Sequence, residues 1–235
     1  MTPPASRPLF TILFSLFTAA LCAAPASAAA FSPLQIGYGI NAQLVDARTP
    51  VYGLRLNLPC SFNKKAAGLD VGFISSVDDF SGLRMNLFAA SETTLNGVEI
   101  ALFDWAKSIN GVHVCALGYV FEEVRGLQVG LFPGGKVRGV QIGGINFGDD
   151  LRGVQAGLVN LAESPWGVQI GLLNLNHAND FQGAQIGVFN FAGALHGLQI
   201  GLVNGLAILR GLQIGLVNIA TESDYPCLPL IRASF

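Results

Sequence analysis

The chain is poor in charged residues, and this scarcity excludes some classes of partner. Only 12% of its 235 residues are Asp, Glu, Lys or Arg, against about 25% in ordinary soluble domains. Thirteen basic and fifteen acidic residues leave a formal net charge of −2. Nucleic acid is therefore not an expected partner, because phosphate binding draws on a surplus of Lys and Arg.

Residues that build catalytic and metal sites are also few. The three histidines, His113, His177 and His196, are scattered along the chain, and none pairs with another at the spacing of metal ligands. The stretch GLFPGGKV at 130–137 comes close to a phosphate-binding loop, but Val137 stands where the magnesium-binding hydroxyl belongs. No nucleophilic residue, general base and orienting acid occupy corresponding positions in neighbouring repeat units. We predict no catalytic, cofactor-binding or metal-binding residues, no cofactor and no enzyme activity.

Long apolar runs are missing beyond the first thirty residues, so no transmembrane helix is expected. The beginning of the chain has one cation, Arg7, then the apolar run PLFTILFSLFTAAL and the small residues ASAAA. This layout predicts a signal peptide over 1–28, with cleavage after Ala28 or Ala30. A lipoprotein site at Cys22 is disfavoured, because Leu21 occupies the place of a small residue.

What the chain does have is a repeat. The octamer GLQIGLVN stands at 197–204 and again at 211–218. Aligned on its first glycine, twelve units follow one another at intervals of 13 to 16 residues. A fixed period of this kind decides the architecture. It predicts a repeat domain over 53–224, a cap or first strand over 29–52, and a closing segment over 225–235. The repeat glycines are Gly53, Gly68, Gly82, Gly97, Gly111, Gly126, Gly139, Gly153, Gly167, Gly183, Gly197 and Gly211.

Within each unit apolar and polar residues alternate, which indicates a β-strand with one buried face. We expect the apolar positions, such as Leu212, Ile214 and Leu216, to form the core. The polar position two residues after the glycine should then face outward as a ladder. Its charges alternate in sign, which predicts ion pairs between neighbouring units, and its glutamines should form an amide ladder. The predicted outward ladder is Arg55, Asp70, Arg84, Glu99, His113, Gln128, Gln141, Gln155, Gln169, Gln185, Gln199 and Gln213.

A second polar column consists of asparagines, which favour turns. Apolar residues change parity around it, which predicts a corner between two short strands. This predicted turn ladder is Asn146, Asn160, Asn174, Asn190, Asn204 and Asn218.

Two all-β architectures fit these units. The first is a β-solenoid, a flat two-sided roll of about twelve short coils. The second is an antiparallel outer-membrane barrel of about fourteen strands. The regular apolar stripe covers about five residues, roughly 17 Å of strand or about 12 Å when tilted, against an apolar band of about 25 Å in such barrels. The short stripe favours the solenoid.

The units GLQIGLVN, GVQIGLLN and GVQAGLVN, with the closing CLPLIRASF, resemble bacterial surface-repeat proteins first named in spirochaetes. The resemblance covers about 53–235. It implies an exported protein at the cell surface or outer membrane, or in the periplasm, of a Gram-negative-type bacterium. The predicted function is structural or adhesive, without catalysis, and the alternative is a porin-like channel. The partner would be an envelope or extracellular ligand of unknown identity, and membrane association stays open.

Overall fold

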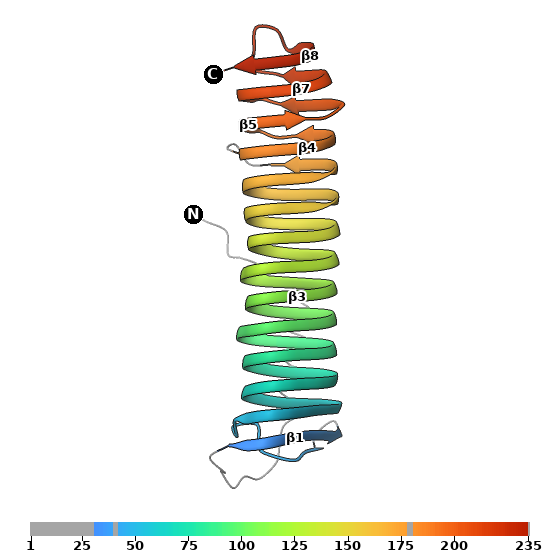
Figure 1. The fold of residues 1–235 in the computed structure, drawn as a ribbon, viewed down its shortest axis with the longest axis vertical. Helices are drawn as coiled ribbons and strands as arrows, with labels where there is room; N and C mark the ends of the chain where they lie inside the picture. The colour runs from blue at the N-terminus through green and yellow to red at the C-terminus, as the bar shows by residue number, and fades with distance from the viewer. Residues whose placement is uncertain (1–30, 40–41, 178–180, 235) are drawn as a thin grey trace, which may run out of the picture.

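The chain forms a long rod of stacked β-coils (Figure 1). The structure is a computed structural model, and it describes residues 31–39, 42–177 and 181–234. The predicted signal peptide, 1–28, lies outside the described residues. The fold class is confirmed, because neighbouring coils pair in parallel as a β-solenoid requires and not as an antiparallel barrel. Within the described ranges, no helix has the length and apolar character needed to cross a bilayer.

One continuous strand winds through most of the rod. This strand, β3, runs over 126 residues and coils around the rod axis. The last coils are divided into shorter strands at their corners. The strands are β1 (Ser32–Gly39), β2 (Ala42–Gln43), β3 (Val51–Asn176), β4 (Phe181–Phe191), β5 (Ala194–Ile200), β6 (Val203–Leu206), β7 (Ile208–Ala220) and β8 (Cys227–Ser234).

The coils stack in the register that the repeat predicts. Gly167 pairs with Gly183 between β3 and β4, and Gly197 pairs with Gly211 between β5 and β7. Asn204 of β6 lies opposite Asn218 of β7. Each residue type therefore lies over its own kind in the next coil, which turns every position of the repeat into a column along the rod.

The repeat glycines mark the closest approach between coils. A Cβ atom on any of them from Gly68 to Gly211 would come within 1.8–2.2 Å of the carbonyl oxygen of the preceding repeat glycine. Gly211 also has a φ of 141°, a conformation that residues with a side chain rarely adopt. The glycine column therefore has both a steric and a conformational cause.

The apolar core is a narrow column beside the glycines. It consists of the residue two places before each repeat glycine, and the described members are nearly inaccessible. Phe181 and Leu195, for example, are fully buried. The apolar column contains Val51, Ala66, Phe80, Leu95, Ile109, Val124, Val137, Leu151, Phe181, Leu195 and Leu209.

Both ends of the stack carry extra strands. β1 lies parallel to the first coil of β3, and β2 folds back antiparallel on β1. At the other end β8 runs antiparallel along β7, with Arg232 opposite Gln213. These strands occupy backbone groups that would otherwise form an open sheet edge.

Candidate functional site: a polar interior and a divided outer surface

The structure reverses the predicted faces of the strands. Every member of the predicted outward ladder, from Arg55 to Gln213, lies inside the rod with at most 1% of its surface exposed. The predicted core residues Ile214 and Leu216 are 38% and 61% exposed. The outward assignment was therefore wrong. Two strands of each coil lie close together around side chains that satisfy one another by hydrogen bonds, which lets polar groups fill the interior.

The seven glutamines from Gln128 to Gln213 form the glutamine ladder, which has one direction. From Gln141 onward, the Nε2 of each donates to the Oε1 of the glutamine in the preceding coil, over 2.6–2.9 Å. Several members also donate to a carbonyl of the opposite strand, as Gln213 does to Ile219. The ladder thus links successive coils and also links the two strands across the interior.

The asparagines are not turn residues, so the predicted turn ladder was also wrong. Asn146, Asn160, Asn174, Asn190, Asn204 and Asn218 are fully buried and lie within strands. They form a second ladder, the asparagine ladder, with bonds of 2.7–2.9 Å between coils. The predicted corner does exist, just before each asparagine, where two successive residues such as Leu216 and Val217 both face outward.

The two ladders run in opposite directions. Each asparagine from Asn146 to Asn204 donates toward the C-terminal end of the rod, whereas the glutamines donate toward the N-terminal end. Their amide dipoles therefore oppose each other. The last glutamine acceptor, Oε1 of Gln213, lacks a hydrogen-bond partner among the described residues. The buried Arg232 lies opposite it in register, and a cation suits the negative end of such a dipole row.

The charged members of the column continue the ladder as ion pairs. Nη1 of Arg55 lies 2.5 Å from Oδ2 of Asp70, and Nε of Arg84 donates to Oε1 of Glu99 over 2.7 Å. The prediction that opposite charges of neighbouring units lie side by side is confirmed. These pairs are inside the rod, where breaking one partner leaves an uncompensated charge.

A buried ionic cluster, formed by Arg84, Glu99, Asp104 and His113, closes this column. Nε2 of His113 lies 3.0 Å from Oδ2 of Asp104, and Nη2 of Arg84 lies 3.9 Å from Oδ1 of Asp104. On the other side of the ring, Nδ1 of His113 meets Nε2 of Gln128 at 3.3 Å, where the glutamine ladder begins. The ion-pair and glutamine columns are therefore continuous.

Sequence reasoning missed Asp104, although a signal for it exists. It stands seven residues after Gly97, the offset at which Asn204 follows Gly197. Asp104 is thus the acidic counterpart of an asparagine-ladder residue, and both positions point into the interior.

The cluster contains a group of metal-ligand type. Glu99, Asp104 and His113 bring one ligand atom each within 4.8 Å of one another. Arg84, however, already lies beside both carboxylates. Two carboxylates balance one guanidinium and one imidazolium, whereas a divalent ion replacing the imidazolium proton would leave a buried excess charge. The arrangement fits an ion-paired cluster better than a metal centre.

The environment of the cluster shifts its protonation equilibria. Burial raises the pKa of Glu99 to about 7, against the opposing charge of Arg84. Burial alone lowers the pKa of His113, but the hydrogen bond and the charge of Asp104 outweigh it, with a further contribution from Cys115, and hold this pKa well above 6.5. The imidazole therefore keeps its proton to a higher pH than a free histidine does, whereas Glu99 is only partly ionised near pH 7.

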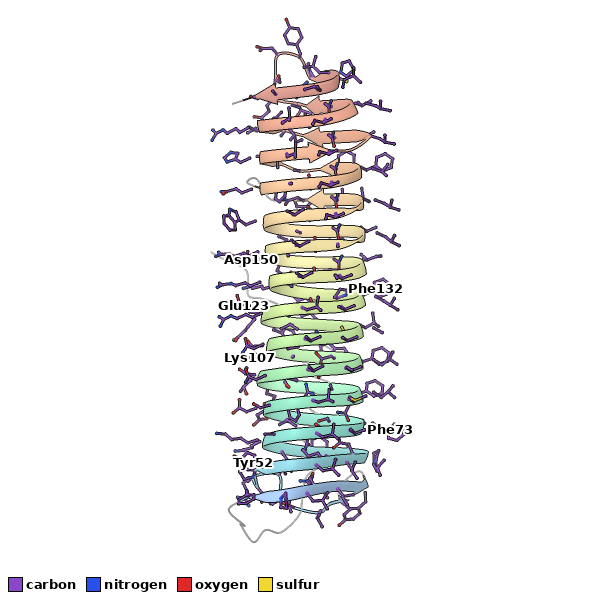
Figure 2. All side chains as sticks on the ribbon, in the orientation of Figure 1. Tyr52, Phe73, Lys107, Glu123, Phe132 and Asp150 are labelled. Carbon is purple, nitrogen blue, oxygen red and sulfur yellow. The ribbon has the colours of Figure 1, made fainter. Side chains whose placement is uncertain are left out.

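The outer surface of the rod is divided into charged and apolar parts (Figure 2). Lys107, Glu123 and Asp150 project from one edge, whereas Phe73 and Phe132 project from the opposite edge. We call the first the charged edge. It is formed by the five residues before each repeat glycine, apart from the buried core residue two places before it. Exposed ion pairs such as Lys107–Glu122 and Arg138–Glu123 run along it.

The opposite side is apolar along the whole repeat. The apolar edge consists of the residues five and six places after each repeat glycine. Among them, Leu158, Leu172 and Leu202 are 60%, 56% and 51% exposed. Two flanks join the edges. One carries the residues one and three places after the glycine, such as Leu198 and Ile200, and the other carries the residue eight places after it. In the described repeat no charged residue occupies these positions on the flanks or the apolar edge.

Compared with known proteins, the chain matches no protein-family profile, no curated protein and no solved structure. The arguments for its function therefore come from its own residues.

Proposed function

We propose that the chain is an exported repeat protein of a bacterial envelope, with a structural or adhesive role and without catalysis. The repeat solenoid is the established part. The observation that carries the proposal is the uncharged, apolar surface along three sides of the rod, with charge confined to one edge. Contiguous exposed apolar surface of this extent is typical of interaction surfaces.

The interior supports a structural role. In the part of the chain described, the side chains within each ladder bond mainly to their own kind in the next coil and to the backbone. The buried ions pair within the ladder. These polar groups stabilise the stacking of coils and are closed off from solvent. The long-range order that they create suits a rigid rod that presents one pattern along its length.

The experiment that tests export is fractionation of a Gram-negative-type host that expresses the full chain, with sequencing of the mature N-terminus. We expect envelope fractions to contain a chain that starts at Ala29 or Phe31. Ala28→Arg is the matched variant, because this residue lies at or near either cleavage point, and it should leave the leader attached. A wild-type chain that stays in the cytosol with residues 1–28 intact would overturn the proposal.

A further inference from the structure

The apolar side of the rod needs an occupant that covers three contiguous surfaces. The apolar edge lies between two flanks that face in different directions, and all three carry exposed apolar side chains, among them Ile142, Leu158 and Phe191. A second copy of the chain that packed against one flank would leave the other flank and the apolar edge exposed to water. A fluid apolar phase would surround all three at once.

The charged edge fits the boundary of such a phase. In the sequence its positions hold nine cations and nine anions, so its net charge is zero. A neutral edge gives no electrostatic preference for anionic lipid, but it suits the zwitterionic headgroup region. The cations are Arg48, Lys64, Lys65, Lys107, Arg125, Lys136, Arg138, Arg152 and Arg210. The anions are Asp78, Asp79, Glu92, Glu122, Glu123, Asp149, Asp150, Glu163 and Asp180, the last of which lies outside the described residues.

Two of the four Tyr and Trp residues of β3 lie on the charged edge, and the other two, Trp105 and Tyr119, lie on a flank. Tyr52 and Trp166, which are 50% and 61% exposed, directly precede a repeat glycine and so belong to the charged edge. The apolar edge carries phenylalanine instead, with Phe73, Phe132 and Phe189 exposed. Tyr and Trp favour the membrane–water interface because they combine an apolar ring with a polar group.

The dimensions and the backbone are also compatible with lipid. A strand of about five residues spans roughly 17 Å, close to the half-thickness of about 15 Å of a bilayer's hydrocarbon core. Along the coils the backbone groups pair with the neighbouring coils, as an apolar environment requires. At the ends, β1 and β8 cover the outermost coils.

We propose that the rod lies lengthwise in one lipid leaflet, with its apolar edge and both flanks among the acyl chains and its charged edge at the headgroups. This inference deepens the proposed envelope role and names its partner as a zwitterionic lipid surface. The driving force is removal of apolar surface from water, so binding is insensitive to salt.

Flotation of the purified mature chain with phosphatidylcholine vesicles tests binding. We expect the protein to float with the vesicles equally at about 0.1 and 1 M salt, since screening acts only on charge. The triple variant Leu158→Glu, Leu172→Glu, Leu202→Glu should lower the vesicle-bound to free ratio at least tenfold. The matched control, Lys107→Ala, Arg138→Ala, Arg152→Ala, changes the net charge by the same three units at the charged edge and should float like the wild type.

The two tryptophans of the chain report orientation. Trp105 lies on a flank, eight residues after Gly97, and Trp166 lies on the charged edge. In Trp166→Phe, the remaining Trp105 should be quenched strongly by lipids brominated in mid-chain. In Trp105→Phe, the remaining Trp166 should be quenched severalfold less. Equal quenching of both would overturn the proposed orientation.

Other results would overturn the lipid proposal itself. These are absence of flotation, flotation only with anionic vesicles at low salt, or a stable oligomer that the triple glutamate variant converts to monomer. The last result would assign the apolar side to a second copy. Because these measurements use purified protein, they do not depend on export, and a cytosolic chain that nevertheless floats would refute the envelope role alone.

Discussion

At the residue scale, the amide side chains inside the rod matter more than the leucines and isoleucines outside it. Gln169 donates to Oε1 of Gln155 and accepts from Nε2 of Gln185. A buried polar group that loses its partner costs about 1–3 kcal/mol. Ile170, the next residue, is 44% exposed and has no comparable partners to leave unpaired.

We therefore predict that Gln169→Leu, which nearly preserves volume, lowers the free energy of unfolding by about 2–4 kcal/mol, because it strands one donor and one acceptor. Ile170→Gln is the matched control and should cost less than about 1 kcal/mol. Urea denaturation followed by circular dichroism measures both. The reverse ranking would mean that the glutamines face solvent.

The ionic cluster predicts a pH dependence with a definite sign. The folded pKa of Glu99, about 7, exceeds its ordinary value of 4.5, so the folded state binds the proton more tightly. That contribution is full below about pH 4.5 and is lost as the pH rises to about 7. The folded pKa of His113 is also raised, and its contribution is lost as the pH rises above about 6.5.

Thermal melts of the repeat rod should accordingly show stability that declines steadily from pH 5 to pH 8. Glu99→Gln, which removes the titrating carboxyl, should flatten the decline between pH 5 and pH 7. The decline above pH 7, which belongs to His113, should remain. A wild-type melting temperature that rises over pH 5 to 7 would contradict the assigned protonation states.

At the element scale, the coil is the unit of the fold, and its register decides which side chains are inside. Residues 197–210 form one repeat of fourteen. Without them, Gln213 lies over Gln185 and Asn218 over Asn190, so both ladders close again. The interval between repeat glycines already varies from 13 to 16 residues, so a change of length before a glycine keeps the register. A removal of thirteen residues that changes the spacing between a glycine and its glutamine shifts the later side chains of that strand to the other face.

We predict that deletion of 197–210 gives a folded rod with one cooperative melt, because each coil contacts only its neighbours. Deletion of 199–211 removes one residue fewer and leaves Gln213 three residues after Gly197 instead of two, so it would bring Leu212 inward and turn Gln213 outward. It should lose the coils beyond 196, which proteolysis with mass spectrometry will detect. Equal protection of both variants would show that the ladders do not set the register.

Much of the structure at the element scale could be predicted from the sequence, and the prediction that failed did so for a physical reason. The period gave the solenoid, and the alternating signs of Arg55, Asp70, Arg84 and Glu99 indicated neighbouring units. Alternation, however, separates two faces without saying which is inside, and hydrophobicity suggested the wrong one. A better signal was that the same polar residue type recurs at this position. Gln recurs in the last seven units without replacement by another polar residue, as reciprocal hydrogen bonding demands and solvent exposure does not.

At the scale of the whole molecule, we expect the two ends of the rod to determine whether it stays a monomer. The N-terminal end carries β1 and β2, and the C-terminal end carries β8. β8 pairs with β7 through an antiparallel ladder, whereas the coils pair in parallel. This reversal ends the repeat, and it covers the backbone of the last coil.

Removal of 225–235 should therefore produce a dimer joined through the C-terminal ends. It exposes the unpaired edge of β7 and the end of the glutamine ladder, and an open strand edge associates with another edge. The dimer should not grow into a filament, because β1 and β2 still cover the other end. Light scattering coupled to size-exclusion chromatography should show a doubled mass relative to the same chain that retains 225–235, under the same conditions. Ile231→Thr is the control. It alters a side chain of β8 that is 61% exposed but keeps the backbone pairing with Ile214, so its mass should equal that of the unmodified chain. A truncated chain with an unchanged mass would show that β8 is not what prevents association at this end.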